Sequence, residues 1–207
     1  MTISELIFIL LFLGSAIGLL VSPFLRRTAA FRKILGALVF VWCVYFAILA
    51  VTDVLRVQQV FKVGEDQCFD EMCFAVSDVQ TLPEQVFIPA IYSASRLYIV
   101  KIRVTSHSRG RAQAEGGLRG RLFDGAVYIN VSETAQKAYD AQHGESPRLT
   151  QRIAPGESVL SVLVFEVPQT MMQPALSLDH GFTPGYFVIG ESPFFHKPDI
   201  HELPGTQ

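Results

Sequence analysis

Two long apolar runs near the N-terminus constrain this chain more than any other feature. Residues 6–25 carry no charged side chain over 20 positions, and residues 34–52 carry none over 19. A helix needs about 20 apolar residues to cross a hydrocarbon core of roughly 30 Å, because each residue adds about 1.5 Å of length. The sequence therefore predicts a transmembrane helical hairpin over residues 1–55, with spans at about 6–25 and 34–52.

Two other interpretations of the first run fit less well. A cleaved signal peptide has a basic start and a shorter apolar core, whereas this chain begins MTISE and has its basic residues after the run. Helices buried in a soluble protein rarely stay apolar on every face over five turns. We therefore expect the hairpin to be retained as a membrane anchor.

The connection between the runs predicts how the hairpin is oriented. Residues 26–33 hold four basic side chains and no acid: Arg26, Arg27, Arg32 and Lys33. Positive residues close to helix ends stay on the cytoplasmic side. We therefore expect a cytoplasmic loop at 26–33, both termini outside, and an extracytoplasmic domain over residues 56–207.

The cysteine pattern agrees with an extracytoplasmic location of this domain. Cys68 and Cys73 are close enough to bridge within a tight loop, and an oxidising compartment favours the bond. The second interpretation of this cysteine pair is two free thiols. A metal site is the least favoured interpretation, because no third or fourth ligand lies nearby. Cys43 falls inside the second span and has no partner in the sequence pattern.

After the spans, the pattern changes from unbroken apolar runs to alternation. Apolar residues at 98, 100, 102 and 104 alternate with polar ones at 101, 103 and 105, the period of two of a half-buried strand. Further short segments rich in Val, Ile, Phe and Tyr are separated by Gly, Pro, Ser or Asp. This spacing predicts an all-β antiparallel sandwich. Residues 133–142 are either a short helix or a long loop.

One segment is more specific than the general strand pattern. In residues 152–180, a turn with Pro155, Gly156 and Glu157 precedes a strand that ends Phe-Glu-Val-Pro at 165–168. This resembles a motif of bacterial immunoglobulin-like domains of unknown function, which are usually tethered as lipoproteins or by membrane helices. The similarity extends loosely back to residues 97–105 and 122–125.

The resemblance implies a fold and a location, and no chemistry. It implies an immunoglobulin-like sandwich, periplasmic or extracellular, held at a bacterial inner or plasma membrane. The chain departs from the family in having two apolar helices in place of a lipidated cysteine, an early cysteine pair, and a C-terminal extension.

Metal and cofactor binding are not expected. The plan of a hairpin followed by a β-sandwich is shared with subunit II of respiratory oxidases, but copper needs clustered thiolate and imidazole ligands. Here the histidine nearest to the cysteine pair is His107. His196 and His201 lie close in sequence with Asp199 between them, a set of side chains that could bind zinc. Pro198 prevents these ligands from lying on one regular helix, however. We expect these two to be surface histidines of the C-terminal tail.

A basic stretch is the most suggestive feature of the outer domain. It contains seven cationic residues against a single acid: Arg96, Lys101, Arg103, Arg109, Arg111, Arg119 and Arg121. Such a patch could engage anionic lipid headgroups, cell-wall polymers or an acidic partner. A solvated strand face followed by a polar loop is the simpler interpretation, and we favour it. Nucleic acid is excluded by the expected compartment.

Gly14 and Gly18 form a G-x-x-x-G pattern in the first span. Small residues at this spacing let two helices approach closely. We expect them to pack against the second span, with homodimerisation or no role as the alternatives.

No pattern in the sequence predicts catalysis. There is no nucleophile elbow and no phosphate-binding glycine loop. We therefore expect a non-enzymatic, membrane-anchored binding module whose partners are the lipid bilayer and a protein or envelope polymer. The alternative is an accessory subunit of a larger membrane complex assembled through the hairpin.

Overall fold

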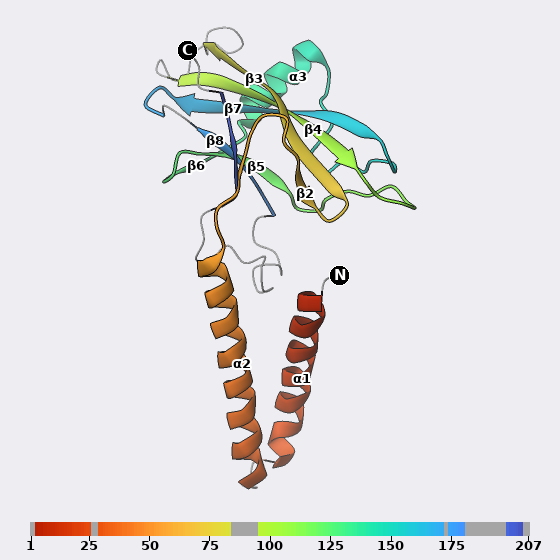
Figure 1. Ribbon diagram of the computed structural model, residues 1–207, viewed down its shortest axis with the longest axis vertical. Helices are drawn as coiled ribbons and strands as arrows, with labels where there is room; N and C mark the ends of the chain where they lie inside the picture. The colour runs from red at the N-terminus through yellow and green to blue at the C-terminus, as the bar shows by residue number, and fades with distance from the viewer. Residues whose placement is uncertain (1–2, 26–28, 84–94, 172–173, 181–197, 205–207) are drawn as a thin grey trace. The chain divides into compact units, whose positions relative to one another are not determined.

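The computed structural model describes residues 3–25, 29–83, 95–171, 174–180 and 198–204. These residues divide into two compact units, a helical unit that runs through Gln58 and a β unit that starts at Gln59 (Figure 1). Each unit is described by itself below.

The helical unit consists of α1 (Ile3–Leu25) and α2 (Ala29–Leu55). Aromatic side chains are among the groups through which the two helices contact each other. The Phe8 ring lies 6.3 Å from the Trp42 ring and 6.2 Å from the Tyr45 ring. The Trp42 indole N–H donates to Ser15 Oγ at 2.8 Å, and that hydroxyl donates to the carbonyl of Leu11. A polar bond of this kind, inside an apolar surround, fixes which faces of the helices meet.

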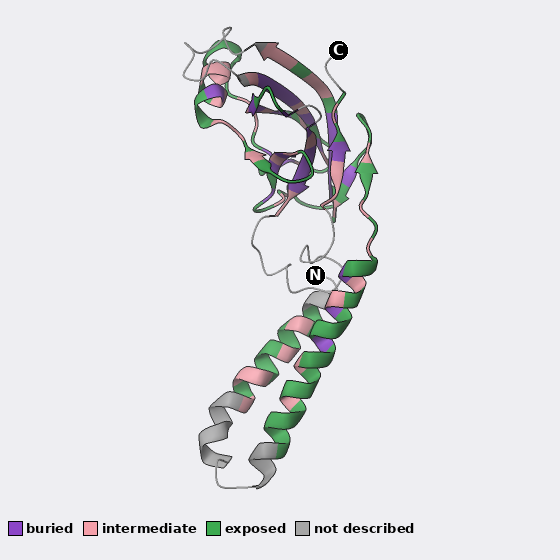
Figure 2. Cartoon of the chain, turned by 90° about the vertical axis from the view of Figure 1, so that its left-hand side faces the viewer, coloured by how far each residue is buried: buried purple, intermediate pink, exposed green. Residues whose placement is uncertain are grey.

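The outward surfaces of both helices are apolar. Leu10 is 59% exposed and Phe40 is 69% exposed, and exposed residues dominate the described parts of both helices in Figure 2. Within the described residues, one helix is long and apolar enough to cross a membrane, at Lys33–Leu55, and a shorter apolar stretch covers Leu6–Gly18. A second span and the orientation of the hairpin therefore stay predictions. Lys33 is exposed, whereas Arg26, Arg27 and the Arg32 side chain lie outside the described residues.

The two glycines of the G-x-x-x-G pattern have different surroundings. A methyl group placed at Gly18 would lie 3.1 Å from Leu38 Cδ1 on α2, whereas one placed at Gly14 would meet nothing within 4 Å. Gly18 thus faces the neighbouring helix, as expected of a packing residue. Gly14 lies on a surface that α2 does not cover.

The β unit is a sandwich of two sheets. The four-stranded sheet has the order β2 (Gln67–Phe69), β3 (Met72–Pro83), β4 (Ser95–Ser106) and β7 (Ser158–Pro168). The five-stranded sheet has the order β1 (Val60–Phe61), β9 (Ile200–Glu202), β8 (Ala175–Asp179), β5 (Arg119–Phe123) and β6 (Tyr128–Asn130). A short helix, α3 (Glu133–His143), connects β6 towards β7.

The predicted antiparallel arrangement needs one correction. Every described strand pair is antiparallel except β1 and β9, which run parallel with Phe61 beside His201. Both strands lie at the ends of the β unit in sequence, and a parallel pair needs a long connection between its strands. The intervening chain of the whole sandwich supplies that connection.

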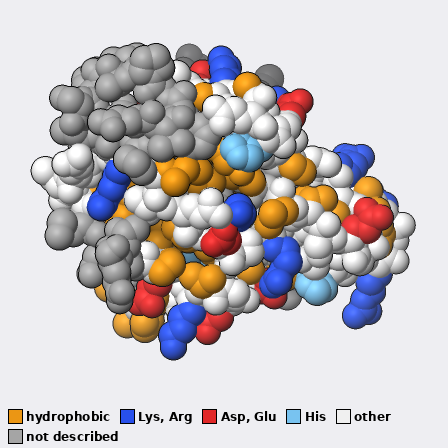
Figure 3. Space-filling model, turned by 90° about the horizontal axis from the view of Figure 1, so that it is seen from above, with side chains coloured by type: hydrophobic (Ala, Val, Ile, Leu, Met, Phe, Trp, Pro, Cys, Tyr) orange, Lys and Arg blue, Asp and Glu red, His pale blue; other side chains and the backbone are white. Residues whose placement is uncertain are grey.

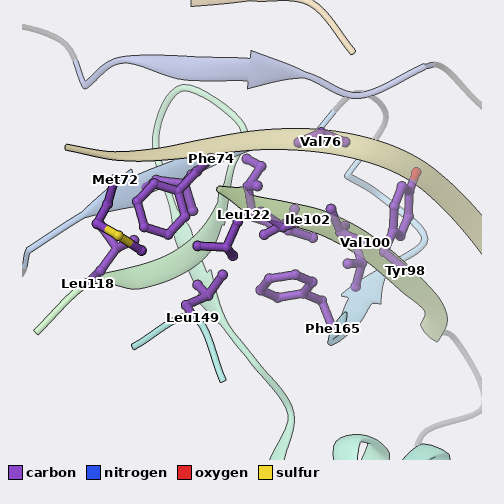
Figure 4. Packing of buried hydrophobic residues seen from close by; sticks show 14 of the residues in the cluster. Met72, Phe74, Val76, Tyr98, Val100, Ile102, Leu118, Leu122, Leu149 and Phe165 are labelled. Atoms are coloured by element: carbon purple, nitrogen blue, oxygen red, sulfur yellow. The ribbon is translucent and has the colours of Figure 1, made fainter. Parts of the chain in front are cut away.

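The core fills the space between the sheets (Figure 4). Tyr98, Val100 and Ile102 point into it from β4, as the alternation predicted, and pack near Phe74 of β3 and Phe165 of β7. Strand β4 is not simply half-exposed, however. Its other face carries Leu97 and Ile99, which are also buried, with Ala135 of α3 and with Val162 and Val164 of β7. The first half of β4 is therefore buried on both faces, and the helix explains why.

The segment that could have been a loop is the helix α3. Ser132 begins it, because its hydroxyl accepts a hydrogen bond from the backbone N–H of Ala135 at 3.2 Å. This is the N-cap arrangement that satisfies one of the unpaired amides of a first turn. Gly144 ends the helix with φ at 90°, a conformation that glycine adopts readily. Ala135 is the side chain that the helix buries against the sheet.

His201 corrects the expectation of surface tail histidines. It is fully buried on β9, where its Nε2 lies 3.0 Å from Gln67 Oε1 and its ring stacks on Phe61 with centroids 5.1 Å apart. Burial lowers the pKa of His201 to about 4 from its ordinary value of 6.5, although Glu65 acts in the opposite direction. Residues Ile200–Glu202 are thus part of the five-stranded sheet. His196 lies outside the described residues.

This histidine makes the stability of the β unit depend on pH. Below pH 6.5 the unfolded chain takes up a proton at His201, whereas the folded chain does not until the pH approaches 4. Stability is therefore present above pH 6.5 and is lost as the pH falls, by about 2 kcal/mol between pH 7 and pH 5. Urea unfolding of the full chain in detergent, followed by circular dichroism, measures this loss. The His201→Gln variant should lose less stability over that range, and the exposed-residue variant His143→Gln should behave like the parent; equal losses in all three would contradict the assignment.

Candidate functional site

The β unit has a groove along one open side of the sandwich, with a volume of about 520 Å³. One wall comes from β5 and the residue before it, the other from the middle of β7, and α3 and the loop at 145–150 close its ends. Ligand sites in proteins usually measure about 300–1,000 Å³. The groove is thus large enough for several side chains or one small molecule.

The groove exists because α3 closes only part of the open side. The backbone N–H of Ser132 donates to the Val164 carbonyl at 2.9 Å, and the Gln136 side-chain oxygen accepts from the Val164 N–H at 3.0 Å. Strand β6 ends at Asn130, opposite Arg121, so it does not cover the part of β5 before Arg121. Leu149 of the following loop fills the interior beneath, where it is buried in the core cluster.

A glycine on β5 lets the two walls approach at the floor of the groove. A methyl group at Gly120 would lie 2.4 Å from Cδ1 of Leu163 on β7, well inside normal contact distance. Any other residue at 120 would therefore displace the Leu163 side chain, which itself lines the groove. The size of the groove depends on this one position.

The β7 wall presents backbone groups as well as side chains. The Glu157 carbonyl accepts a hydrogen bond from the Ser106 N–H on the side that faces β4. The N–H and C=O groups of Val164 both bond on the opposite side. Because the direction of these groups alternates along an antiparallel strand, Leu160 and Val162 point theirs away from β4, like Val164. Among the described residues, nothing bonds the outward N–H and C=O groups of Leu160 and Val162. This part of β7 is an unpaired sheet edge.

Ser161 adds a buried polar group to the same wall. Its residue is 1% exposed and its hydroxyl has no hydrogen-bond partner among the described residues. A buried hydroxyl without a partner costs roughly 1–3 kcal/mol relative to a bonded one. Ser161 is among the residues that line the groove, and its hydroxyl lies buried within the wall.

The charges around the groove nearly balance. Its lining includes four cations and three carboxylates: Arg119, Arg121, Lys137 and Arg148 against Glu133, Asp140 and Glu145. Arg121 is already paired, because its guanidinium lies 2.7 Å from Asp179. The groove therefore has no strong preference for an anion.

The seven residues of the basic stretch do not gather in one place. Lys101 pairs with Asp78 at 2.9 Å and lowers the pKa of that carboxyl, and Arg103 lies 3.5 Å from Asp66. Arg119 and Arg121 belong to the other sheet, on β5. In Figure 3, cationic and acidic side chains are interspersed on the face that is shown.

The three remaining members of the stretch differ among themselves. Arg96 donates to the carbonyl of Met171, and its guanidinium lies 5.2 Å from the centre of the Tyr98 ring. Arg109 and Arg111 are exposed on the loop after β4. The arrangement fits a solvated strand face and a polar loop, the simpler of the two interpretations.

Cys68 and Cys73 form a disulfide in the structure. They face each other across the β2–β3 hairpin, with Cα atoms 4.0 Å apart. Together with the apolar N-terminal helix, the disulfide is typical of extracytoplasmic proteins. Cys43 is a free thiol, exposed on α2.

A second polar cluster lies at the end of the sandwich. His180 Nε2 is 2.7 Å from Glu115 Oε1, and the Gln113 side chain donates to Glu71 at 2.6 Å. The His180 ring also meets the Phe69 ring edge to face. These pairs join the loop before β5 to the β2–β3 turn and to the residue that follows β8. Within the described ranges, no three His, Cys, Asp or Glu side chains are placed to hold one metal ion.

The groove is the site that the sequence alone does not reveal. Its walls come from segments about 40 residues apart, and neither carries a ligand-binding motif. Two local signals do exist. Residues 158–165 form an uncharged strand without a proline, which is unusual for a sheet edge, and Gly120 interrupts the apolar pattern of β5.

Comparisons with known proteins return structural similarities alone. No protein-family profile matches the sequence, and no curated protein is significantly similar to it. A conserved hypothetical protein from Bacillus anthracis is 14% identical, with 59% of this chain covering 92% of that one and a TM-score of 0.45. An uncharacterized beta-sandwich protein from Clostridium difficile is 10% identical, with coverages of 72% and 95% and a TM-score of 0.43.

The yjhA protein from Bacillus subtilis gives a similar result. It is 12% identical, with coverages of 69% of this chain and 99% of that one and a TM-score of 0.46. The chain is thus structurally similar to uncharacterized bacterial β-sandwich proteins. Membership of the immunoglobulin-like family has no support from sequence comparison and stays a prediction.

Two serines at the groove should respond oppositely to the loss of their hydroxyls. Ser132→Ala removes the N-cap of α3 and the bond that Ser132 Oγ donates to Glu166 at 2.7 Å, so it should cost about 1–2 kcal/mol of unfolding free energy. Ser161→Ala removes a hydroxyl that has no partner among the described residues, so it should be neutral or stabilising. Urea unfolding of the full chain in detergent compares the two. A large loss in Ser161→Ala would show that its hydroxyl is bonded in the folded protein.

Proposed function

We propose that this chain is a membrane-anchored, extracytoplasmic binding module that has no catalytic activity and takes its ligand in the groove between β5 and β7. In this proposal α1 and α2 both span the membrane, with residues 26–33 on the cytoplasmic side. The β unit is then an immunoglobulin-like sandwich on the outer face of a bacterial plasma membrane. The observation that carries the proposal is the groove, with its unpaired strand edge and its buried hydroxyl.

The helical unit supports the anchoring part of the proposal. A surface that is apolar on every side is stable in lipid, whereas in water it would expose many large side chains. The bond from Trp42 to Ser15 satisfies both groups inside the helix pair. The disulfide supports the outer location of the β unit, because such bonds persist in oxidising compartments.

The binding part rests on what the groove offers. Its walls supply backbone donors and acceptors, one buried hydroxyl and an apolar floor that includes Leu118, Leu149 and Leu163. A few polar groups over an apolar floor are typical of ligand sites. Activated nucleophiles are not among the described features of the groove. Binding therefore explains the groove better than catalysis does.

Site-directed photo-cross-linking in intact membranes tests this proposal. A benzophenone side chain at Thr150, which lines the groove, should give a discrete adduct, whereas the same group at the exposed Gln142 of α3 should not. Gly120→Ala should reduce the adduct several-fold, because its methyl group displaces Leu163.

Gly116→Ala is the matched control for that substitution. A methyl group at Gly116 meets nothing within 4 Å, so the adduct should persist. Equal labelling from positions 150 and 142, or an adduct that survives Gly120→Ala unchanged, would exclude the groove as the ligand site.

A second function, an accessory subunit assembled through the hairpin, is favoured by the surroundings of Gly14. This glycine lies on a surface of α1 that α2 leaves uncovered, where another helix could approach closely. Gly14→Leu should then shift the protein from a larger complex to a smaller one on native gels in mild detergent. Gly36→Leu, a glycine of α2 with equally open surroundings, serves as the control and should leave the complex unchanged. If both variants migrate like the parent, this alternative fails.

A further inference from the structure

The unpaired edge of β7 is the most informative feature of the groove. On the edge that faces away from β4, Val164 is already engaged, since it bonds to Ser132 and Gln136. Before it, the outward backbone groups at 160 and 162 have no partner in the described part of the chain. A sheet edge of this kind is a template for one more strand. The groove lies directly beside it, because residues 161–163 form its wall.

Resting on the proposed function, we propose that the ligand is an extended polypeptide segment that adds to the four-stranded sheet as a strand beside β7. Its backbone exchanges hydrogen bonds with Leu160 and Val162. Alternate side chains of the added strand then enter the groove, next to Ser161 and Leu163, and the others lie on the outer face. Such strand addition obtains affinity from the backbone and specificity from the alternate side chains.

The side chains of β7 indicate which surroundings each face of the added strand would contact. Val162 and Val164 pack beneath α3 with Ala135, so even-numbered residues lie on the outer face of the sheet. Phe165 and Val167 enter the main core, so odd-numbered residues, including Ser161, lie on the inner face. Inward side chains of the ligand therefore meet the apolar floor beside Ser161. Small apolar or hydroxyl-bearing side chains, such as valine and threonine, fit these surroundings.

The balance of charge favours a neutral peptide over an anionic polymer. Four cations and three carboxylates line the groove, and Arg121 is neutralised by Asp179. A polyanion such as a cell-wall polymer would meet as many carboxylates as unpaired cations. A peptide of low net charge meets no such repulsion and uses the backbone edge, which a polysaccharide or lipid headgroup does not match.

A second copy of the chain is a less suitable occupant. The free edge, about residues 158–162, spans roughly 17 Å at 3.4 Å per residue. Pairing two such short edges buries little surface, whereas stable dimers usually bury more than about 1,000 Å². The groove is also bounded by α3 and by the loop at 145–150, so a slim extended chain enters it more easily than a whole domain.

The test uses the full chain in detergent micelles and a fluorescein-labelled octapeptide of alternating valine and threonine. Binding is followed by fluorescence anisotropy, and hydrogen exchange reports the amides of Leu160 and Val162. We expect saturable binding that slows exchange at these two amides. The same peptide with every backbone nitrogen methylated should not bind, because it has no N–H donors.

Two protein variants separate backbone pairing from side-chain packing. Val162→Pro removes the outward N–H, which bonds to nothing in the described fold, and should weaken binding about two- to tenfold, as expected for a lost hydrogen bond. Val162→Thr keeps the N–H and nearly the same shape, so it should bind like the parent. Thermal unfolding of both variants verifies that they are folded, and the methylated peptide tests the proposal on the unaltered protein.

Three outcomes would overturn the inference. Equal binding of the methylated and unmethylated peptides would exclude strand addition. Competition by dextran sulfate with no change in exchange at positions 160 and 162 would identify an electrostatic site. Sedimentation as a dimer that Val162→Pro converts to a monomer would assign the edge to a second copy. If the cross-link from position 150 persists in any of these cases, the binding module stands and only its ligand class is wrong.

Discussion

The backbone of Val164 is the point on which the β unit depends. Its carbonyl accepts from Ser132 and its N–H donates to Gln136, and the Ser132 hydroxyl also donates to Glu166 of the same strand, so α3 is tied to the outward edge of β7. The same contacts close one end of the open side, and the outward backbone groups of Leu160 and Val162 stay without a partner among the described residues. The position of the helix and the extent of the groove therefore follow from these bonds.

The bonds at Val164 also explain the burial of β4. Because α3 is held over the outer face, Leu97 and Ile99 are covered there, while Tyr98 and Val100 face the main core. Past the reach of the helix, the outer face of β4 carries Lys101 and is no longer covered. One strand thus changes from a two-sided to a one-sided burial pattern where the helix ends.

How much could be predicted from the sequence depends on the distance over which each feature is encoded. The disulfide and the alternation in β4 are local, since a five-residue spacing and a period of two are visible in the residues themselves. The position of His201 is not local, because its burial depends on pairing with β1, about 140 residues earlier. The groove depends on Gly120, Leu163 and Leu149 together, and none of them is distinctive alone. Chain order carries no information about which strand edges remain open.

Electrostatics and backbone geometry give different answers about the ligand, and the magnitudes decide between them. Exposed ion pairs such as Lys101 with Asp78 contribute about 0–1 kcal/mol each, and salt screens them. The seven cations of the basic stretch are divided between two sheets and a loop, so their fields do not add at one place. Backbone bonds at a sheet edge are directional and contribute roughly 0.5–1.5 kcal/mol each. Four such groups on Leu160 and Val162, aligned along one line, therefore specify a ligand more strongly than the scattered charges can.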